Sequence, residues 1–244
     1  MQHFLAVQHS FAEFFGALET QWESRGIGFK YVRPVTGEDV AGTPSQFDAL
    51  WLLGAAHAAA DREHCTWLDD EMRLVRAFAK ARRPIVGLGF GAHVLAAAYG
   101  ATLSAKPEHD ARFTLARALV ADDPVAQAID GRRVLVMANG SAELGAGLEP
   151  VAADEQGRWI AFRTGELGYG LLFRPELKPG MLEDMVMEDE RPLPEDIGAL
   201  IEAAREHWPA MQDTTGRVAA ALVTALGLMD ERAKPPVFRI VEQR

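Results

Sequence analysis

The stretch that decides the fold is Pro84-Ile85-Val86-Gly87-Leu88-Gly89-Phe90-Gly91-Ala92-His93-Val94-Leu95-Ala96. It predicts a short buried strand, a sharp glycine-rich turn and the start of an apolar helix. A plain strand-to-helix turn needs such glycines only for close packing. In a nucleophile elbow, by contrast, a strained central residue, here Gly89, points into a cleft. In a dinucleotide-binding turn, Gly87 to Ala92 would fit G-x-G-x-x-A, and Glu108 follows at roughly the 20 residues typical of a ribose-binding acid.

Strand-like and helix-like segments alternate through the first half of the chain. Ser10 is a candidate N-cap for the first helix, and Gly26 follows its end. This alternation predicts an α/β fold with an open, mostly parallel sheet and helices on both faces. We expect strands at 4–8, 29–32, 47–54 and 85–86, and helices at 11–22, 67–81 and 91–99.

The second half of the chain has a different pattern of predicted elements. Shorter strands are expected at 114–118, 133–137, 159–163 and 169–173, separated by Gly and Asp turns. From Glu195 the pattern is helical, and Pro235-Pro236 separates it from a tail, 237–244, that we expect to be an extended arm. We therefore predict one α/β domain over residues 1–190, with a C-terminal helical extension and arm over 191–244 that packs on the same domain.

Composition excludes several classes of function. The chain has 244 residues, of which 48% are hydrophobic and 25% charged, as in soluble globular proteins. Its net charge of −10 disfavours nucleic acid and anionic membranes as partners. No apolar stretch is long enough to span a bilayer, no signal peptide is apparent, and one cysteine allows no intrachain disulfide. We expect a cytoplasmic protein.

Distant segments make the central turn resemble the elbow of class I glutamine amidotransferases, whose pattern is Gly-x-Cys-x-Gly. Phe173-Arg174-Pro175-Glu176 resembles the family's Phe-His-Pro-Glu. Residues 48–55 resemble the strand that leads into its Gly-Gly oxyanion loop, and Ala138-Asn139-Gly140-Ser141 stands at the place of its His-Gly-Asp turn. Val7-Gln8-His9 resembles the start of the stand-alone, GMP-synthase-like members. The resemblance covers roughly residues 4 to 190 and implies a three-layer, flavodoxin-like α/β fold.

The resemblance also implies where the catalytic residues would stand. The nucleophilic cysteine position falls on Gly89, the histidine position on Arg174, and the glutamate position on Glu176, which is retained. Glycine offers no nucleophile, and arginine stays protonated and cannot act as a general base. Glutaminase activity is therefore not expected.

Part of the former substrate pocket would remain. The family's glutamine-binding residue after the elbow falls on His93, and Gly54, Ala55 and Phe90 are the positions that would line the rest of the pocket. Two alternatives stay open for Arg174. It either pairs with Glu176, or it faces a small carboxylate or phosphate ligand.

Three functions follow from these residues. The leading one is a catalytically inactive pseudo-glutaminase that acts as a binding or regulatory subunit, with a partner synthase or ligase or as a homodimer. The alternative is an enzyme with rebuilt chemistry in the old glutamine cleft, which would use His93, Arg174 and Glu176 on an acidic small molecule. A weaker alternative is dinucleotide binding at Gly87 to Ala92.

No bound cofactor and no metal are expected. Cys65 and its neighbours His64 and His57 suggest a transplanted nucleophile or a metal site, but they lack standard zinc spacing. The run Asp69-Asp70-Glu71 is interpreted as a solvated helix face.

Overall fold

The computed structural model describes residues 1–40, 42–104, 109–188 and 193–230. Its main sheet has eight strands, and two further pairs of strands lie beside it. The main sheet contains β1 (His3–Val7), β2 (Gly28–Val32), β3 (Ala49–Leu52), β4 (Ile85–Leu88), β7 (Arg117–Ala118), β10 (Leu148–Ala153), β11 (Trp159–Thr164) and β12 (Gly168–Leu171). The pairs are β5 (Thr102–Leu103) with β9 (Ala142–Glu143), and β6 (His109–Leu115) with β8 (Arg133–Asn139).

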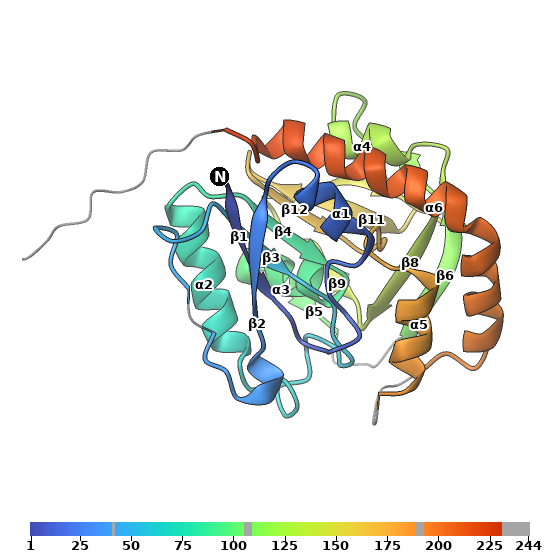
Figure 1. Cartoon of the computed structure of the whole chain (residues 1–244), viewed down its shortest axis with the longest axis horizontal. Coiled ribbons are helices and arrows are strands. Elements are labelled where there is room, and N and C mark those ends of the chain that lie inside the picture. Colours follow the sequence, from blue (N-terminus) through green and yellow to red (C-terminus); the bar gives the residue numbers. More distant parts are fainter. Residues whose placement is uncertain (41, 105–108, 189–192, 231–244) are drawn as a thin grey trace, which may run out of the picture.

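The strand order of the main sheet is β2-β1-β3-β4-β12-β11-β10-β7. The pairings from β2 across to β12 are parallel, and those from β12 to β7 are antiparallel. The predicted α/β fold with an open, mostly parallel sheet is confirmed. Because the carboxyl ends of parallel strands meet at one edge of a sheet, the segments after β1, β3, β4 and β12 converge there (Figure 1).

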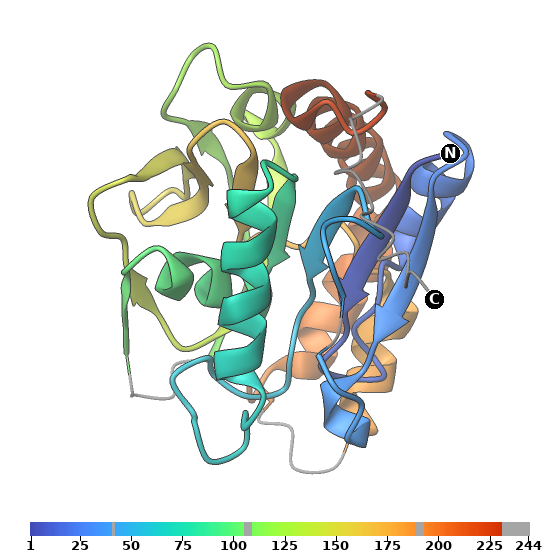
Figure 2. The ribbon, with the colours of Figure 1, turned by 90° about the vertical axis from the view of Figure 1, so that its left-hand side faces the viewer.

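Helices cover both faces of this sheet (Figures 1 and 2). In the described residues the helices are α1 (Ala17–Glu23), the short 3₁₀ helix η1 (Pro34–Thr36), α2 (Leu68–Lys80), α3 (Phe90–Ala98), α4 (Pro124–Ile129), α5 (Pro179–Val186) and α6 (Ile197–Leu226). Side chains along β1 point alternately to the two faces. Phe4 and Ala6 enter a core with α1, α4 and α6, whereas Leu5 and Val7 enter a core with α2 and α3. The sheet and the helices on its two faces therefore form three layers.

The long helix α6 packs on the rest of the molecule. It contacts α1, α4, α5 and β8, and Figure 1 shows it along the outer edge of the ribbon. Its Thr215 hydroxyl donates to the Pro175 carbonyl at 2.6 Å. This bond ties the helix to the segment that carries Arg174 and Glu176. The tail expected to form an extended arm, 237–244, lies outside the described residues.

The predicted first helix, 11–22, starts too early in the sequence. Helix α1 begins only at Ala17, after Gly16 with φ of 51°, and residues 10–16 form turns. Ser10 caps no helix; its oxygen accepts from the Ala12 N–H at 3.1 Å, and its hydroxyl donates to Glu188. The helical spacing of the phenylalanines therefore reflects two separate packing surfaces. Strand β10 and helices α4 and α5 were not predicted from the sequence.

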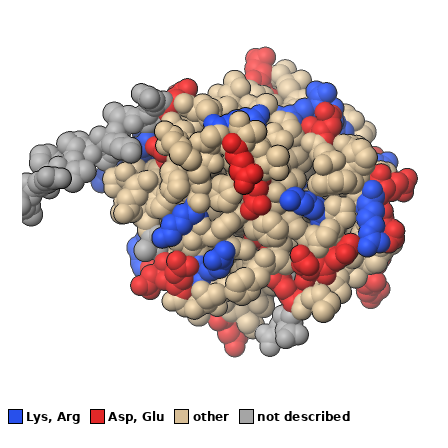
Figure 3. Space-filling model, viewed as in Figure 1, with Lys and Arg blue, Asp and Glu red and all other residues tan. Residues whose placement is uncertain are grey.

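The surface in Figure 3 shows basic and acidic side chains interspersed across the described part of this face, with no continuous basic area. None of the helices in the described ranges combines the length and apolar character that a bilayer crossing requires.

Candidate functional site

The central turn is sharply bent at its middle residue. Gly89 has φ of 54° and ψ of −112°, and α3 starts at the next residue. Its N–H donates to the Leu171 carbonyl at 2.8 Å, which fixes the turn against β12. A non-glycine residue in this conformation is strained by about 1–3 kcal/mol. The turn therefore presents residue 89 to the sheet edge with no side chain on it.

Arg174 lies directly over Gly89. A Cβ atom built on Gly89 would lie 2.8 Å from Nη1 of Arg174 and 3.1 Å from the Met137 carbonyl oxygen. The Arg174 side chain is 3% exposed, and each of its three nitrogens donates to a protein acceptor. Nε donates to Glu176 Oε1 at 2.6 Å, Nη2 to Glu13 Oε2 at 2.6 Å, and Nη1 to the Met137 carbonyl at 3.2 Å.

This buried ion cluster, Glu13-Arg174-Glu176, fills the edge of the sheet between the segments that follow β1 and β12. Burial on its own lowers the pKa of the Arg174 guanidinium, but the carboxylates of Glu176 and Glu13 outweigh burial and hold this pKa above its ordinary value. Burial raises the pKa of Glu176, and Arg174 opposes that rise. Of the two alternatives for Arg174, the geometry shows pairing with Glu176.

Glu13 was not predicted from the sequence to lie in the site. It sits in the turn segment before α1 and is 1% exposed. A Cβ on Gly54 would lie 1.5 Å from Glu13 Oε2 and 2.5 Å from Arg174 Nη2, so position 54 accepts no side chain. The sequence does hold one indication of its role. Glu13 is a lone carboxylate between Phe11 and Phe15, and a charge in an apolar segment that folds inward needs a buried partner.

His93 lies one turn into α3, in a different environment from Arg174. It is 1% exposed, and its Nε2 has no hydrogen-bond partner among the residues that the structure describes. Burial lowers its pKa to about 4. His93 therefore stays neutral at physiological pH.

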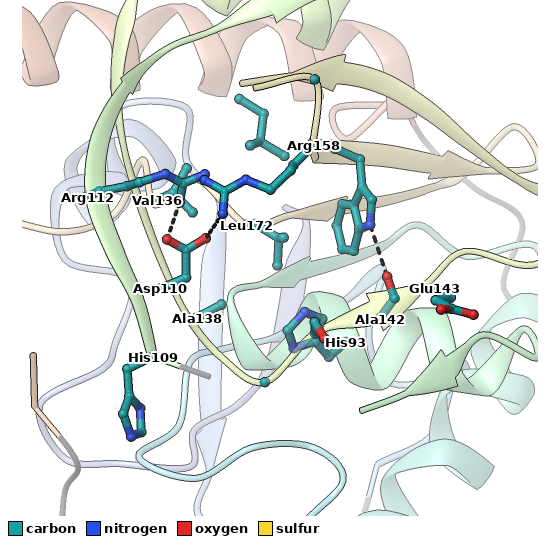
Figure 4. A pocket seen from close by; sticks show the side chains of 15 residues that line it. His93, His109, Asp110, Arg112, Val136, Ala138, Ala142, Glu143, Arg158 and Leu172 are labelled. Atoms are coloured by element: carbon teal, nitrogen blue, oxygen red, sulfur yellow. Dashed lines mark hydrogen bonds and ion pairs between the residues drawn. The ribbon is translucent and has the colours of Figure 1, made fainter. Parts of the chain in front are cut away.

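A cavity of about 680 Å³ opens beside His93. Its apolar wall includes Val136, Ile160 and Leu172. In Figure 4 the guanidinium groups of Arg112 and Arg158 meet Asp110 on one side of the cavity, and His93 lies on another. The Trp159 indole, which donates to the Ala142 carbonyl at 3.1 Å, also lines it. A neutral imidazole, paired guanidinium groups and an aromatic ring are suited to a small polar ligand.

The remaining predicted pocket residues do not join His93. Ala55 lines a second cavity of about 480 Å³ together with His9. Phe90 packs against the His9 ring, with 4.7 Å between centroids. The four pocket positions are thus divided: Gly54 borders the ion cluster, Ala55 and Phe90 lie on the His9 side, and His93 faces its own cavity.

Glu71 and Cys65 are both buried in the structure. Glu71 does not lie on a solvated helix face. It lies on the inner face of α2, where its Oε1 is 2.9 Å from His9 Nε2 in a fully buried pair. Burial raises the pKa of Cys65 to about 12, so its thiol is unsuited to act as a nucleophile. Glu108, the candidate ribose-binding acid, lies outside the described residues.

We compared the sequence with protein-family models and with known proteins. No protein-family model matches the chain. Over 107 residues the chain is 30% identical to the glutamine amidotransferase-like protein YfeJ of Salmonella typhimurium. The aligned part makes up 43% of this chain and 45% of YfeJ, so the match spans less than half of that relative.

Comparison with solved structures covers nearly the whole chain. A glutamine amidotransferase from Thermotoga maritima superimposes with a TM-score of 0.77 and 20% identity, over 92% of this chain and 98% of that one. The glutamine amidotransferase of Methylobacillus flagellatus gives 0.79 and 14%, over 93% and 96%. A protein from Thermoplasma acidophilum described as a GMP synthase subunit gives 0.59 and 15%, over 95% and 98%. The chain therefore has the flavodoxin-like fold of the class I glutamine amidotransferases.

Proposed function

We propose that this chain is a member of the class I glutamine amidotransferase-like proteins that has lost glutaminase chemistry and acts as a binding or regulatory subunit. The observation that carries the proposal is the ion cluster Glu13-Arg174-Glu176 over Gly89. In the glutaminase mechanism a thiolate attacks the amide carbon, and a histidine passes the proton to the departing ammonia. Here the nucleophile position has no side chain, and the base position holds a permanently protonated arginine.

The cluster also blocks the space that a substrate would need. Glu13 and Arg174 lie against Gly54, and Arg174 lies against Gly89, so the gap between the two turns is filled by protein atoms. All three nitrogens of Arg174 are engaged by Met137, Glu13 and Glu176. This argues against Arg174 as the receptor for an external carboxylate or phosphate. A small ligand would instead use the cavity beside His93.

A binding role fits the fold, because a scaffold without its nucleophile can still dock on another protein. The Thermoplasma acidophilum neighbour is itself described as a GMP synthase subunit, which supports a partner of the synthase or ligase kind. A homodimer is the other form of association that we consider. A cytoplasmic location agrees with both.

A second candidate function rests on His93. His93 is a buried, neutral imidazole beside a cavity, and one of its nitrogens has no partner among the described residues. That nitrogen can accept a hydrogen bond or a proton from a ligand, although a pKa of about 4 makes it a weak base. The arrangement supports rebuilt chemistry on an acidic small molecule. In such an enzyme Arg174 and Glu176 would stabilise the fold of the site and would take no part in the reaction. Dinucleotide binding at Gly87 to Ala92 has less support, since Arg174 and Leu52 approach this turn closely.

The test is a glutaminase assay on the purified full-length chain, with ammonia release as the readout and a glutamine-directed electrophile followed by mass spectrometry as a second readout. We expect no ammonia above the heat-treated control and no covalent adduct. Light scattering of the same sample reports its association state. Ammonia release that disappears in Glu176→Ala would contradict the proposal, and release of a different product from acidic substrates that disappears in His93→Gln would support the second candidate.

A further inference from the structure

We propose that His57, Asp61 and His64 form a binding site for one divalent transition-metal ion. The three residues lie on the loop between β3 and α2, and one ligand atom from each lies within 4.8 Å of the other two. His64 Nδ1 is 2.8 Å from Asp61 Oδ2, and His57 Nδ1 is 3.8 Å from the same oxygen. From the sequence, His57 and His64 were candidates together with Cys65, and Asp61 was not predicted to join them.

The separations suit a metal centre. Zinc binds imidazole nitrogen and carboxylate oxygen at about 2.0–2.2 Å, which in a tetrahedral site places neighbouring ligand atoms about 3.4 Å apart. The separations of 2.8 and 3.8 Å bracket this value. The side chains of His57, Asp61 and His64 are 26%, 32% and 48% exposed, so small rotations cost little packing. Two imidazoles with one carboxylate suit zinc, iron, cobalt and nickel better than magnesium or calcium.

The loop holds these groups in place through its own backbone. Asp61 Oδ1 accepts a hydrogen bond from the His64 backbone N–H at 3.2 Å. The other carboxylate oxygen, Oδ2, therefore points toward the two imidazole rings. The Cys65 N–H donates to the Asp61 carbonyl at 3.1 Å, and the buried Cys65 side chain anchors the end of the loop. The His57 and His64 rings stack with 4.5 Å between centroids and 10° between planes. Cys65 therefore supports the loop and does not serve as a ligand.

The metal would have an open side. His57 and His64 both line the cavity of about 480 Å³ that also contains Trp67 and Ser10. Three protein ligands leave at least one position of a zinc-like ion for water or a small anion, as in sites that keep an exchangeable ligand. Asn139 Nδ2 donates to the Ala56 carbonyl at 2.6 Å, so the loop is connected to the strand end beside the His93 cavity.

The experiment is calorimetric titration of Zn²⁺ into the untagged, EDTA-stripped full-length chain, followed by visible spectroscopy with Co²⁺. We expect one ion per chain and cobalt d–d bands without a thiolate charge-transfer band. His57→Ala, Asp61→Asn and His64→Ala should each weaken zinc binding at least tenfold. Cys65→Ser and His207→Ala, which removes a histidine on α6, should leave it within about twofold.

Thermal unfolding of the metal-free proteins separates loss of the site from loss of the fold. Because all three side chains are partly exposed, each apo variant should unfold within about 2 °C of the apo wild type. Zinc binding that is absent, or that the three ligand variants leave unchanged, would overturn the proposal. A thiolate charge-transfer band that Cys65→Ser abolishes would also overturn it. None of these outcomes depends on whether the chain has glutaminase activity.

Discussion

The ion cluster over Gly89 makes Arg174→Met the most informative single substitution. Methionine keeps much of the volume of arginine but removes the positive charge, and it leaves the carboxylates of Glu13 and Glu176 facing each other. Both glutamates are 1% exposed, so neither can regain its hydration without opening the fold. Removing one partner of a buried ion pair typically costs about 3–5 kcal/mol, because an uncompensated charge stays in the interior.

This cost should be visible in the midpoint of thermal unfolding. A chain of this size shifts its Tm by about 2–4 °C per kcal/mol, so the expected decrease at pH 7 is about 6–20 °C. Urea unfolding should show the same loss of free energy of unfolding with an unchanged m-value. The deficit should shrink as the pH falls toward 5, since protonation neutralises the two carboxyls that would have lost the Arg174 charge. The triple variant Glu13→Gln, Arg174→Met, Glu176→Gln should recover most of the loss, because it leaves no buried charge in the cluster.

The matched control is Arg205→Met. Arg205 also pairs with two glutamates, Glu183 and Glu202, but its side chain is 51% exposed. Exposed pairs contribute about 0–1 kcal/mol, so this variant should unfold close to the wild type. If Arg174→Met is as stable as Arg205→Met, or if the triple variant is no better than Arg174→Met, the cluster is not the buried charged unit described above.

Two further substitutions address the turn and His93. Gly89→Cys should lose about 1–3 kcal/mol from the positive φ and should still release no ammonia from glutamine, because the neighbouring Arg174 cannot accept a proton; a wild-type Tm together with measurable glutaminase activity would contradict this. The pKa of His93 falls from an unfolded value of about 6.5 to about 4 in the fold, so its neutral form favours folding fully above pH 6.5, and this contribution is lost as the pH falls toward 4. Relative to His93→Gln, the wild type should lose up to about 3 kcal/mol between pH 7 and pH 4 in urea titrations, and parallel curves for the two proteins would refute this origin.

The sequence predicted the parts of the fold that depend on local pattern. The apolar runs before Gly54 and Gly89 become β3 and β4, and the amphipathic segment 67–81 becomes α2. The predicted start of the first helix failed because the spacing of Phe11, Phe14 and Phe15 is compatible with turns as well as with a helix. Only the tertiary structure shows that α1 begins at Ala17, after Gly16, and that residues 10–16 form turns at the sheet edge.

The residues of the candidate site were likewise predicted only in part from the sequence. Positions 89, 174 and 176 could be located from the sequence, because each is fixed by a neighbouring strand end. Glu13, Asp61 and the His9–Glu71 pair could not, since their partners are far away in the sequence or face them only after the loops have folded. A pattern of residue types records which side chains a loop carries, but not which of them the loop turns inward.

The geometry also shows that Gly89 and Arg174 depend on each other. A side chain at position 89 would start from a Cβ only 2.8 Å from Arg174 Nη1, and the guanidinium cannot retreat without breaking its bonds to Glu13 or Glu176. Gly54 adds the same constraint from the other side, because any Cβ there would overlap Glu13. Gly89 and Arg174 therefore belong to one packing arrangement. Under the proposed function, a cysteine side chain introduced at position 89 alone would contact the ion cluster before any substrate, so glutaminase chemistry would require positions 89, 174 and 13 to change together.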